Sequence, residues 1–92
     1  MKFEFDPFKS ESNKRKHGID FMEVQQLWNG DRFELIAKPG EDGQMRYGVL
    51  GKIKGINHTV IITYRGSTVR IISARLSTEK EKAIYESEIK KI

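Results

Sequence analysis

Three arginines, Arg65, Arg70 and Arg75, recur every five residues in a stretch that predicts a β-hairpin over residues 58–75. The planar guanidinium group stays charged and donates two parallel hydrogen bonds, which suits it to phosphate. Such a set could grip a phosphodiester and stabilise the charge growing on it in a transition state. Because side chains alternate across a strand, Arg70 and Arg75 share one side only if a bulge lies between them. We also expect at least one of the three to pair with a carboxylate of the last helix.

The second group is the cationic run Lys14–His17, at the end of the predicted first helix. Lys9, Asn13, Lys16 and His17 share one helical face, at positions i, i+4, i+7 and i+8. One hypothesis is that this face meets an anion, with Lys16 and His17 as phosphate ligands or acid–base groups, because imidazole titrates near neutral pH. The alternative is a solvated face whose charges aid solubility.

The composition of the 92 residues favours one soluble cytoplasmic domain over residues 1–92. Cysteine is absent, which excludes disulfides, thiolate zinc sites and a cysteine nucleophile. No signal peptide, membrane span, P-loop or metal-ligand cluster is visible, so no cofactor is predicted. The net charge is +4, and residues 65–92 carry seven basic against four acidic side chains, which favours a phosphate-bearing partner.

The elements that must position these groups follow from turn and capping signals. Asp6 and Gly18 predict the bounds of the first helix, Asp20 and Glu23 begin a second, and Thr78 with Glu81 predicts a capping box for the last. Strands are predicted at 2–5, 32–38, 45–54, 58–64 and 68–75.

The order β-α-α-β-β-β-β-α predicts an α+β fold, an antiparallel meander with helices on one face. The open face would suit an extended polymer better than a small metabolite. The apolar stripe of the last helix is Tyr85, Ile89 and Ile92, and His58 is expected at the surface at the end of a strand.

Several blocks resemble the BrnT family of bacterial toxins. The opening block is Phe3–Pro7 with Lys9, Asn13 and Lys16–Ile19, and the middle block is Arg46, Tyr47 and Gly51. The closing block is Thr63, Arg65, Gly66 and Arg70–Arg75, followed by Glu81 and Tyr85.

The resemblance implies a RelE-like fold and a ribonuclease toxin of a type II toxin–antitoxin module that cleaves RNA without metal, using the 2′-hydroxyl as nucleophile. It also implies a small DNA-binding antitoxin, BrnA, which caps the toxin and through which the complex binds operator DNA and represses its own operon. The alternative is a non-catalytic module that binds RNA or protein through the same basic face.

For that chemistry we assign Arg65 and Arg75 to the phosphate and the transition state, and Lys16 and His17 to substrate grip or proton transfer. The RNA-binding candidates are Lys9, Asn13, Arg46 and Arg70. Glu23 and Tyr85 are candidates for proton transfer. The sequence departs from the family at Phe5, usually Trp, and at Ile62 and Tyr64, often Tyr and an acidic residue.

Overall fold

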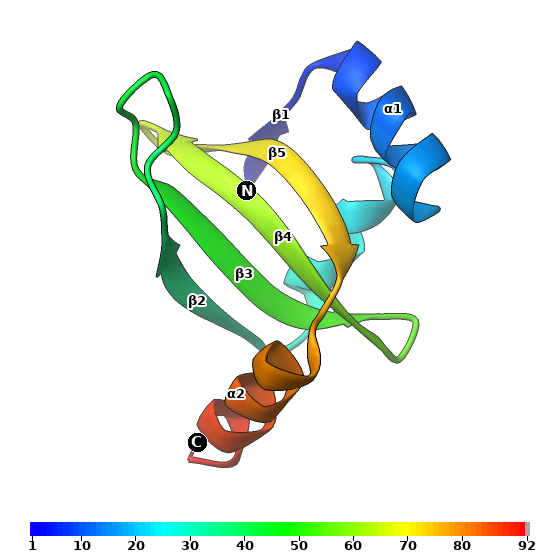
Figure 1. The fold of residues 1–92 in the computed structure, drawn as a ribbon, viewed down its shortest axis with the longest axis vertical. Coiled ribbons are helices and arrows are strands. Elements are labelled where there is room, and N and C mark those ends of the chain that lie inside the picture. The colour runs from blue at the N-terminus through cyan, green and yellow to red at the C-terminus, as the bar shows by residue number, and fades with distance from the viewer. Residues whose placement is uncertain (92) are drawn as a thin grey trace.

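The computed structural model describes residues 1–91 and has the predicted α+β class, with a five-stranded sheet and helices (Figure 1). In chain order the elements are β1 (Lys2–Glu4), α1 (Pro7–His17), the 3₁₀ helix η1 (Glu23–Asn29), β2 (Arg32–Ala37), β3 (Arg46–Ile53), β4 (Ile56–Arg65), β5 (Thr68–Leu76) and α2 (Glu79–Lys90). The strands lie within two residues of their predicted bounds. The predicted apolar position at 92 lies outside the described residues.

The predicted caps of α1 and α2 are confirmed. Asp6 accepts a hydrogen bond from the backbone N–H of Phe8 at 2.9 Å, and α1 ends at Gly18, whose φ of 77° is the left-handed conformation that glycine adopts without strain. Thr78 and Glu81 exchange the two hydrogen bonds of a capping box at the start of α2. These local signals fix where both α-helices begin.

The second predicted helix is a 3₁₀ helix rather than an α-helix. Its entry is as predicted, because Asp20 accepts from the N–H of Glu23 at 2.8 Å and Glu23 accepts from the N–H of Asp20 at 3.0 Å. Phe21, Val24 and Leu27 are all fully buried. Val24 and Leu27 lie on one side of η1 because residues i and i+3 eclipse in a 3₁₀ helix, and Phe21 packs into the same core just before the helix begins.

The sheet is mixed, whereas an antiparallel meander was predicted. Its order is β1-β5-β4-β3-β2, and β1 pairs parallel with β5, with Phe3 opposite Val69. The other three pairings are antiparallel. Because β1 is short, it covers only the first part of β5, and α1 runs beside the remainder (Figure 1).

The prediction that the helices cover one face is wrong, because η1 and α2 lie on opposite faces (Figure 1). We call the side that carries Val60 and Ile62 the η1 face, and the side that carries Thr59 and Thr63 the α2 face. The side chain of Leu27 in η1 lies against Gly51, on the η1 face. Thr59 donates to Glu81 of α2 at 2.9 Å on the other face. Figure 1 shows that α2 covers only one end of this face.

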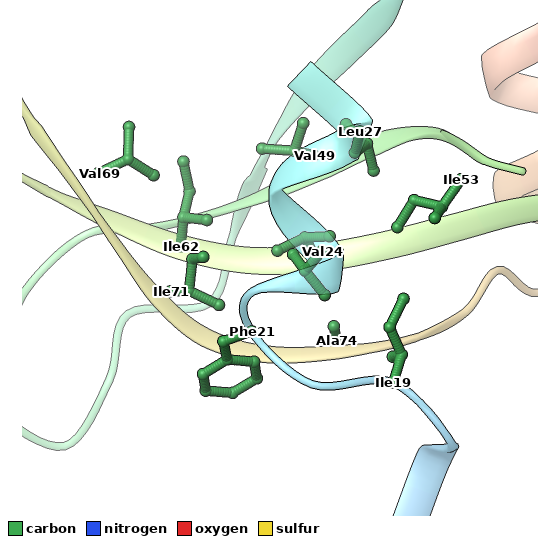
Figure 2. Close-up of a cluster of buried hydrophobic side chains, with 11 residues drawn as sticks. Ile19, Phe21, Val24, Leu27, Val49, Ile53, Ile62, Val69, Ile71 and Ala74 are labelled. Atoms are coloured by element: carbon green, nitrogen blue, oxygen red, sulfur yellow. The ribbon is translucent and has the colours of Figure 1, made fainter. Parts of the chain in front are cut away.

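The main core lies between η1 and the sheet (Figure 2). Its members are Ile19, Phe21, Val24, Leu27, Val49, Ile53, Val60, Ile62, Val69, Ile71 and Ala74. His58, expected at the surface, is buried on this face, and its Nδ1 lies 2.9 Å from the carbonyl oxygen of Ile56. The core therefore lies on the η1 face of the sheet, and the polar and charged residues of the site lie on the α2 face.

Gly51→Ala is expected to destabilise the fold. A Cβ at position 51 would lie 2.7 Å from the side chain of the buried Leu27, and overpacking of this kind costs about 1–3 kcal/mol. Gly48→Ala on the same strand is the control, because its Cβ would meet only ordinary contacts at 3.8 Å. Urea denaturation measures both, and equal stability of the two variants would contradict the close contact.

Candidate functional site

One extra residue in β5 decides where the arginines point. The register runs from Ile61 opposite Ser73 to Ile62 opposite Ile71, which leaves Ile72 as the inserted residue of a bulge. Such a bulge reverses the face to which every following residue of the strand points.

The bulge places Arg75 on the α2 face, where Arg65 and Arg70 also lie. Residues directly opposite one another in a sheet share a face, and Arg70 lies opposite Thr63 while Arg75 lies opposite Thr59. Arg65 follows Thr63 by two residues on the same strand and therefore has the same orientation. The sequence required a bulge between Arg70 and Arg75 for the two to share one face, and the structure has that bulge.

Ion pairs hold two of these arginines apart. Arg70 Nη1 lies 3.2 Å from Glu4 Oε2 on β1, and Arg75 forms two bonds to Glu81, at 2.7 and 3.0 Å. The expected pairing with a carboxylate of the last helix is confirmed by Arg75. Thr59 and Thr63, which mark the two positions, are four residues or about 13 Å apart along β4. The two guanidinium groups are therefore directed toward different points.

The network around Arg75 stabilises the ionised form of Glu81. Hydrogen bonding from Arg75 lowers the pKa of Glu81 from its usual 4.5 to about 2, with further hydrogen bonds from Thr78 and Thr59. The same hydrogen bond raises the pKa of Arg75. Both groups remain charged at neutral pH.

A groove between α1 and β5 adjoins the arginines. It is lined by Lys9, Ser12, Asn13, Lys16, His17, Ile72 and Ser73, and we call it the α1–β5 groove. The predicted cationic face of α1 is thus confirmed as one surface. Ser73 lies opposite Ile61 and two residues before Arg75, so it belongs both to this groove and to the α2 face. The groove and the arginine-bearing face are contiguous at Ser73.

Asn13 forms the floor of this groove and is buried. Its side-chain amide donates to the carbonyl oxygens of Ile19 at 2.8 Å and Ala74 at 3.0 Å, and it accepts from the N–H of Ala74 at 3.2 Å. The side chain pairs with the open edge of β5 as a neighbouring strand would. Asn13, a predicted RNA-binding residue, is therefore placed to join α1 to the sheet.

The remaining predicted cations lie at the rim. Arg65 is exposed beside the β4–β5 turn, and the guanidinium of Arg46 lies against Gly40 in the β2–β3 loop. Within residues 1–91, no carboxylate lies within ion-pair distance of Lys9, Lys16, Arg46 or Arg65. These cations remain available to an anion.

Glu23 and Tyr85 lie away from the arginines. Glu23 pairs with Lys14 at 2.6 Å while it caps η1, and this hydrogen bond lowers its pKa. Tyr85 is the buried residue of α2 and donates to the carbonyl oxygen of Asp31 at 3.4 Å. Burial raises the pKa of Tyr85. Neither residue lines the α1–β5 groove, although Glu23 lines a second groove together with His17 and His58.

The three departures from the family pattern do not touch this surface. Phe5 makes an edge-to-face contact with Phe21, with ring centroids 5.8 Å apart. Ile62 is fully buried in the main core. Tyr64 lies on the η1 face, donates to Glu34, and its pKa is raised to about 12, chiefly by burial.

Two sequence signals were missed. Glu81 was noted as a capping residue and in the closing block of the family resemblance, but not as the partner of Arg75 and Thr59. Ser73 had no motif of its own, and only the register of β5 shows that it joins the groove to the α2 face.

No three His, Cys, Asp or Glu side chains in residues 1–91 are grouped so that they could hold a metal ion. Among the same residues, no helix has the length and hydrophobicity needed to cross a membrane.

The chain matches the model of a known protein family. The family described as "Ribonuclease toxin, BrnT, of type II toxin-antitoxin system" matches residues 5–81, most of the chain. No curated protein matches the chain significantly. The matched range includes α1, the bulge, all four arginines discussed above and Glu81.

Asn13→Ala is expected to lower the free energy of unfolding. The substitution leaves backbone groups of Ala74 and Ile19 unpaired, and each buried unsatisfied group costs about 1–3 kcal/mol. Ser12→Ala, on the same groove wall, is the control and should leave stability nearly unchanged. A stable Asn13→Ala protein with weakened RNA binding would instead assign Asn13 to the ligand.

The Glu81 network also predicts an acid dependence. Because the pKa of Glu81 is lowered by folding, its contribution to stability is complete above pH 4.5 and is lost as the pH falls towards 2. The unfolding free energy of wild type should therefore fall more between pH 5 and pH 2 than that of Glu81→Gln. Parallel curves for the two proteins, measured by urea denaturation at each pH, would contradict this.

Proposed function

The chain belongs to the BrnT family of ribonuclease toxins of type II toxin–antitoxin systems, and on this premise we propose that it cleaves RNA by metal-independent transesterification. The site is the α2 face together with the α1–β5 groove. The observation that supports this most is the bulge at Ile72, which puts Arg75 on the same open face as Arg65 and Arg70, beside a cationic groove.

The reaction needs three kinds of catalytic group from the protein. The 2′-oxygen attacks the adjacent phosphorus and the bond from phosphorus to the 5′-oxygen breaks, which gives a 2′,3′-cyclic phosphate and a 5′-hydroxyl. A base takes the 2′-proton, an acid protonates the 5′-oxygen, and cations stabilise the five-coordinate phosphorane. All three can come from side chains at neutral pH.

Arg75 is the proposed transition-state cation. It is only partly exposed, fixed by two bonds to Glu81 and adjacent to the groove through Ser73. Arg65 and Arg70 lie on the same face but toward the β4–β5 turn. Because Arg70 is held at a distance from Arg75, we assign Arg70 and Arg65 to flanking phosphates of the same strand. Arg46 extends this cationic surface at its rim.

His17 and Lys16 are the proposed groups for proton transfer and phosphate grip. Both line the α1–β5 groove, and His17 also lines a second groove on the other side with His58. An imidazole can accept the 2′-proton or supply the proton to the 5′-oxygen at neutral pH. Lys9 binds the RNA backbone farther along α1. Glu23 and Tyr85 have no role in this mechanism, because neither lines the α1–β5 groove; Glu23 pairs with Lys14 and the N–H of Asp20, and Tyr85 donates to the carbonyl oxygen of Asp31.

Family membership also suggests the fold type, the cellular location and the partner protein. We propose a RelE-like arrangement of the fold, a cytoplasmic setting and RNA that binds as an extended strand across the open part of the α2 face. The partner is a BrnA-like antitoxin that covers this cationic surface, and operator DNA is bound and the operon repressed only through the antitoxin. The net charge of +4 suits both RNA and an acidic covering segment.

Arg75→Ala and His17→Ala should each lower RNA cleavage about 10²–10³-fold, because each removes a group acting in the transition state. Arg15→Ala is the matched control: this exposed cation is on the same helix, pairs with Glu11 at 3.6 Å and is not part of the groove. Cleavage is measured with purified protein on a labelled RNA. An RNA with a 2′-deoxy sugar at the scissile position should not be cleaved.

The same variants are then expressed in cells with and without the antitoxin. Wild type and Arg15→Ala should arrest growth unless the antitoxin is produced with them. Full toxicity of both Arg75→Ala and His17→Ala would reject the site. RNA binding without cleavage by wild type would favour the non-catalytic module instead.

A further inference from the structure

We propose that Glu81 is a positioning residue, which holds Arg75 by one edge of its guanidinium and keeps the other edge free for the phosphate. The inference rests on the proposed ribonuclease activity and deepens it. It concerns a carboxylate that does not itself contact RNA.

Glu81 is rigidly anchored before it meets Arg75. Its Oε1 accepts from the backbone N–H of Thr78 at 2.8 Å and from the hydroxyl of Thr59 at 2.9 Å. Thr59 is itself buried and lies 2.9 Å from the hydroxyl of Ser77. The carboxylate is thus fixed by the first turn of α2 and by β4, and its side chain is only 18% exposed. A carboxylate held at two points can orient a flexible partner.

The hydrogen bonds of Arg75 show which of its donors are committed. Nη1 donates to Glu81 at 2.7 Å and to the carbonyl oxygen of Leu76 at 3.3 Å, and Nη2 donates to Glu81 at 3.0 Å. A guanidinium group has five N–H donors. One N–H of Nη2 and the N–H of Nε therefore have no acceptor in residues 1–91. Together they form a second edge with two parallel donors, the geometry that binds a phosphate bidentately.

This arrangement has a kinetic consequence. An unrestrained arginine side chain must lose rotamer freedom when it grips the phosphorane, and Glu81 removes that cost in advance. Since a preorganised donor acts where charge develops, its loss should affect the chemical step more than ground-state binding. A competing possibility is that Glu81 occupies Arg75 and inhibits it, in which case removal of its charge would speed cleavage.

Glu81→Gln separates positioning from helix capping. Glutamine at the third helical position still serves a capping box, so the start of α2 is retained while the charge is lost. Glu79→Gln, on the same turn, is the matched control, because the side chain of Glu79 is 92% exposed and pairs with Lys82, not with Arg75. Thr59→Val is a second test that leaves Glu81 in place and removes one of its two anchors.

The experiment measures kcat and KM for cleavage of a short RNA, and binding of its all-2′-deoxy analogue by fluorescence anisotropy. Glu81→Gln should lower kcat at least 10-fold and change KM and analogue binding less than 3-fold. Thr59→Val should lower kcat in the same direction but less, and Glu79→Gln should match wild type. In an Arg75→Ala background, Glu81→Gln should have no further effect, because Glu81 acts through Arg75.

Unchanged or faster cleavage by Glu81→Gln would overturn the inference, and so would an equal additional loss in the Arg75→Ala background. If Arg75→Ala is inactive while Glu81→Gln is fully active, the ribonuclease site stands and only the positioning role fails. If wild type cleaves no RNA, the proposed function fails and this inference fails with it. Thermal unfolding of each variant confirms that the measured protein is folded.

Discussion

The single inserted residue in β5 is the constraint on which the rest of the site depends. Side chains alternate along a strand, so if Ile72 were paired regularly and did not form a bulge, the residues after it would point to the other face. Arg75 would then lie opposite the buried His58 on the η1 face, where an unpaired charge is costly, and Ala74 would leave the main core. Packing of Ala74 against η1 therefore enforces the bulge, and the bulge in turn places Arg75 with Arg70. The stability of the core and the geometry of the site are set by the same residue.

Local signals in the sequence were sufficient for the helix ends and the strands. Asp6, Gly18 and the Thr78–Glu81 pair act through hydrogen bonds or backbone conformations within a few residues, so the sequence alone identifies them. The parallel pairing of β1 was not predictable in this way, because it joins residues that are more than sixty positions apart. The face of the sheet on which α2 packs likewise depends on residues that are distant in the sequence, because Glu81 binds Thr59 and Glu86 pairs with Lys52.

In the candidate site, too, some features follow from the local sequence and others depend on contacts between distant residues. Residue type and helical spacing were enough to bring Lys9, Lys16 and His17 to one groove. Asn13 has the same spacing, yet its amide fills the open edge of β5, a role visible only once that strand is in place. The bulge did have a signal, because the buried positions Val69, Ile71 and Ala74 break the period of two. Family membership supplies the reaction class, and the register of β5 supplies the geometry that the class requires.

The most direct measurement is an NMR titration of the protein with a non-cleavable 2′-deoxy oligonucleotide. The account predicts that the largest chemical-shift changes fall on Arg70, Ser73 and Arg75 of the α2 face and on Lys16 and His17 of the groove. Changes confined to the η1 face, around the Tyr47–Tyr64 pair, would contradict it.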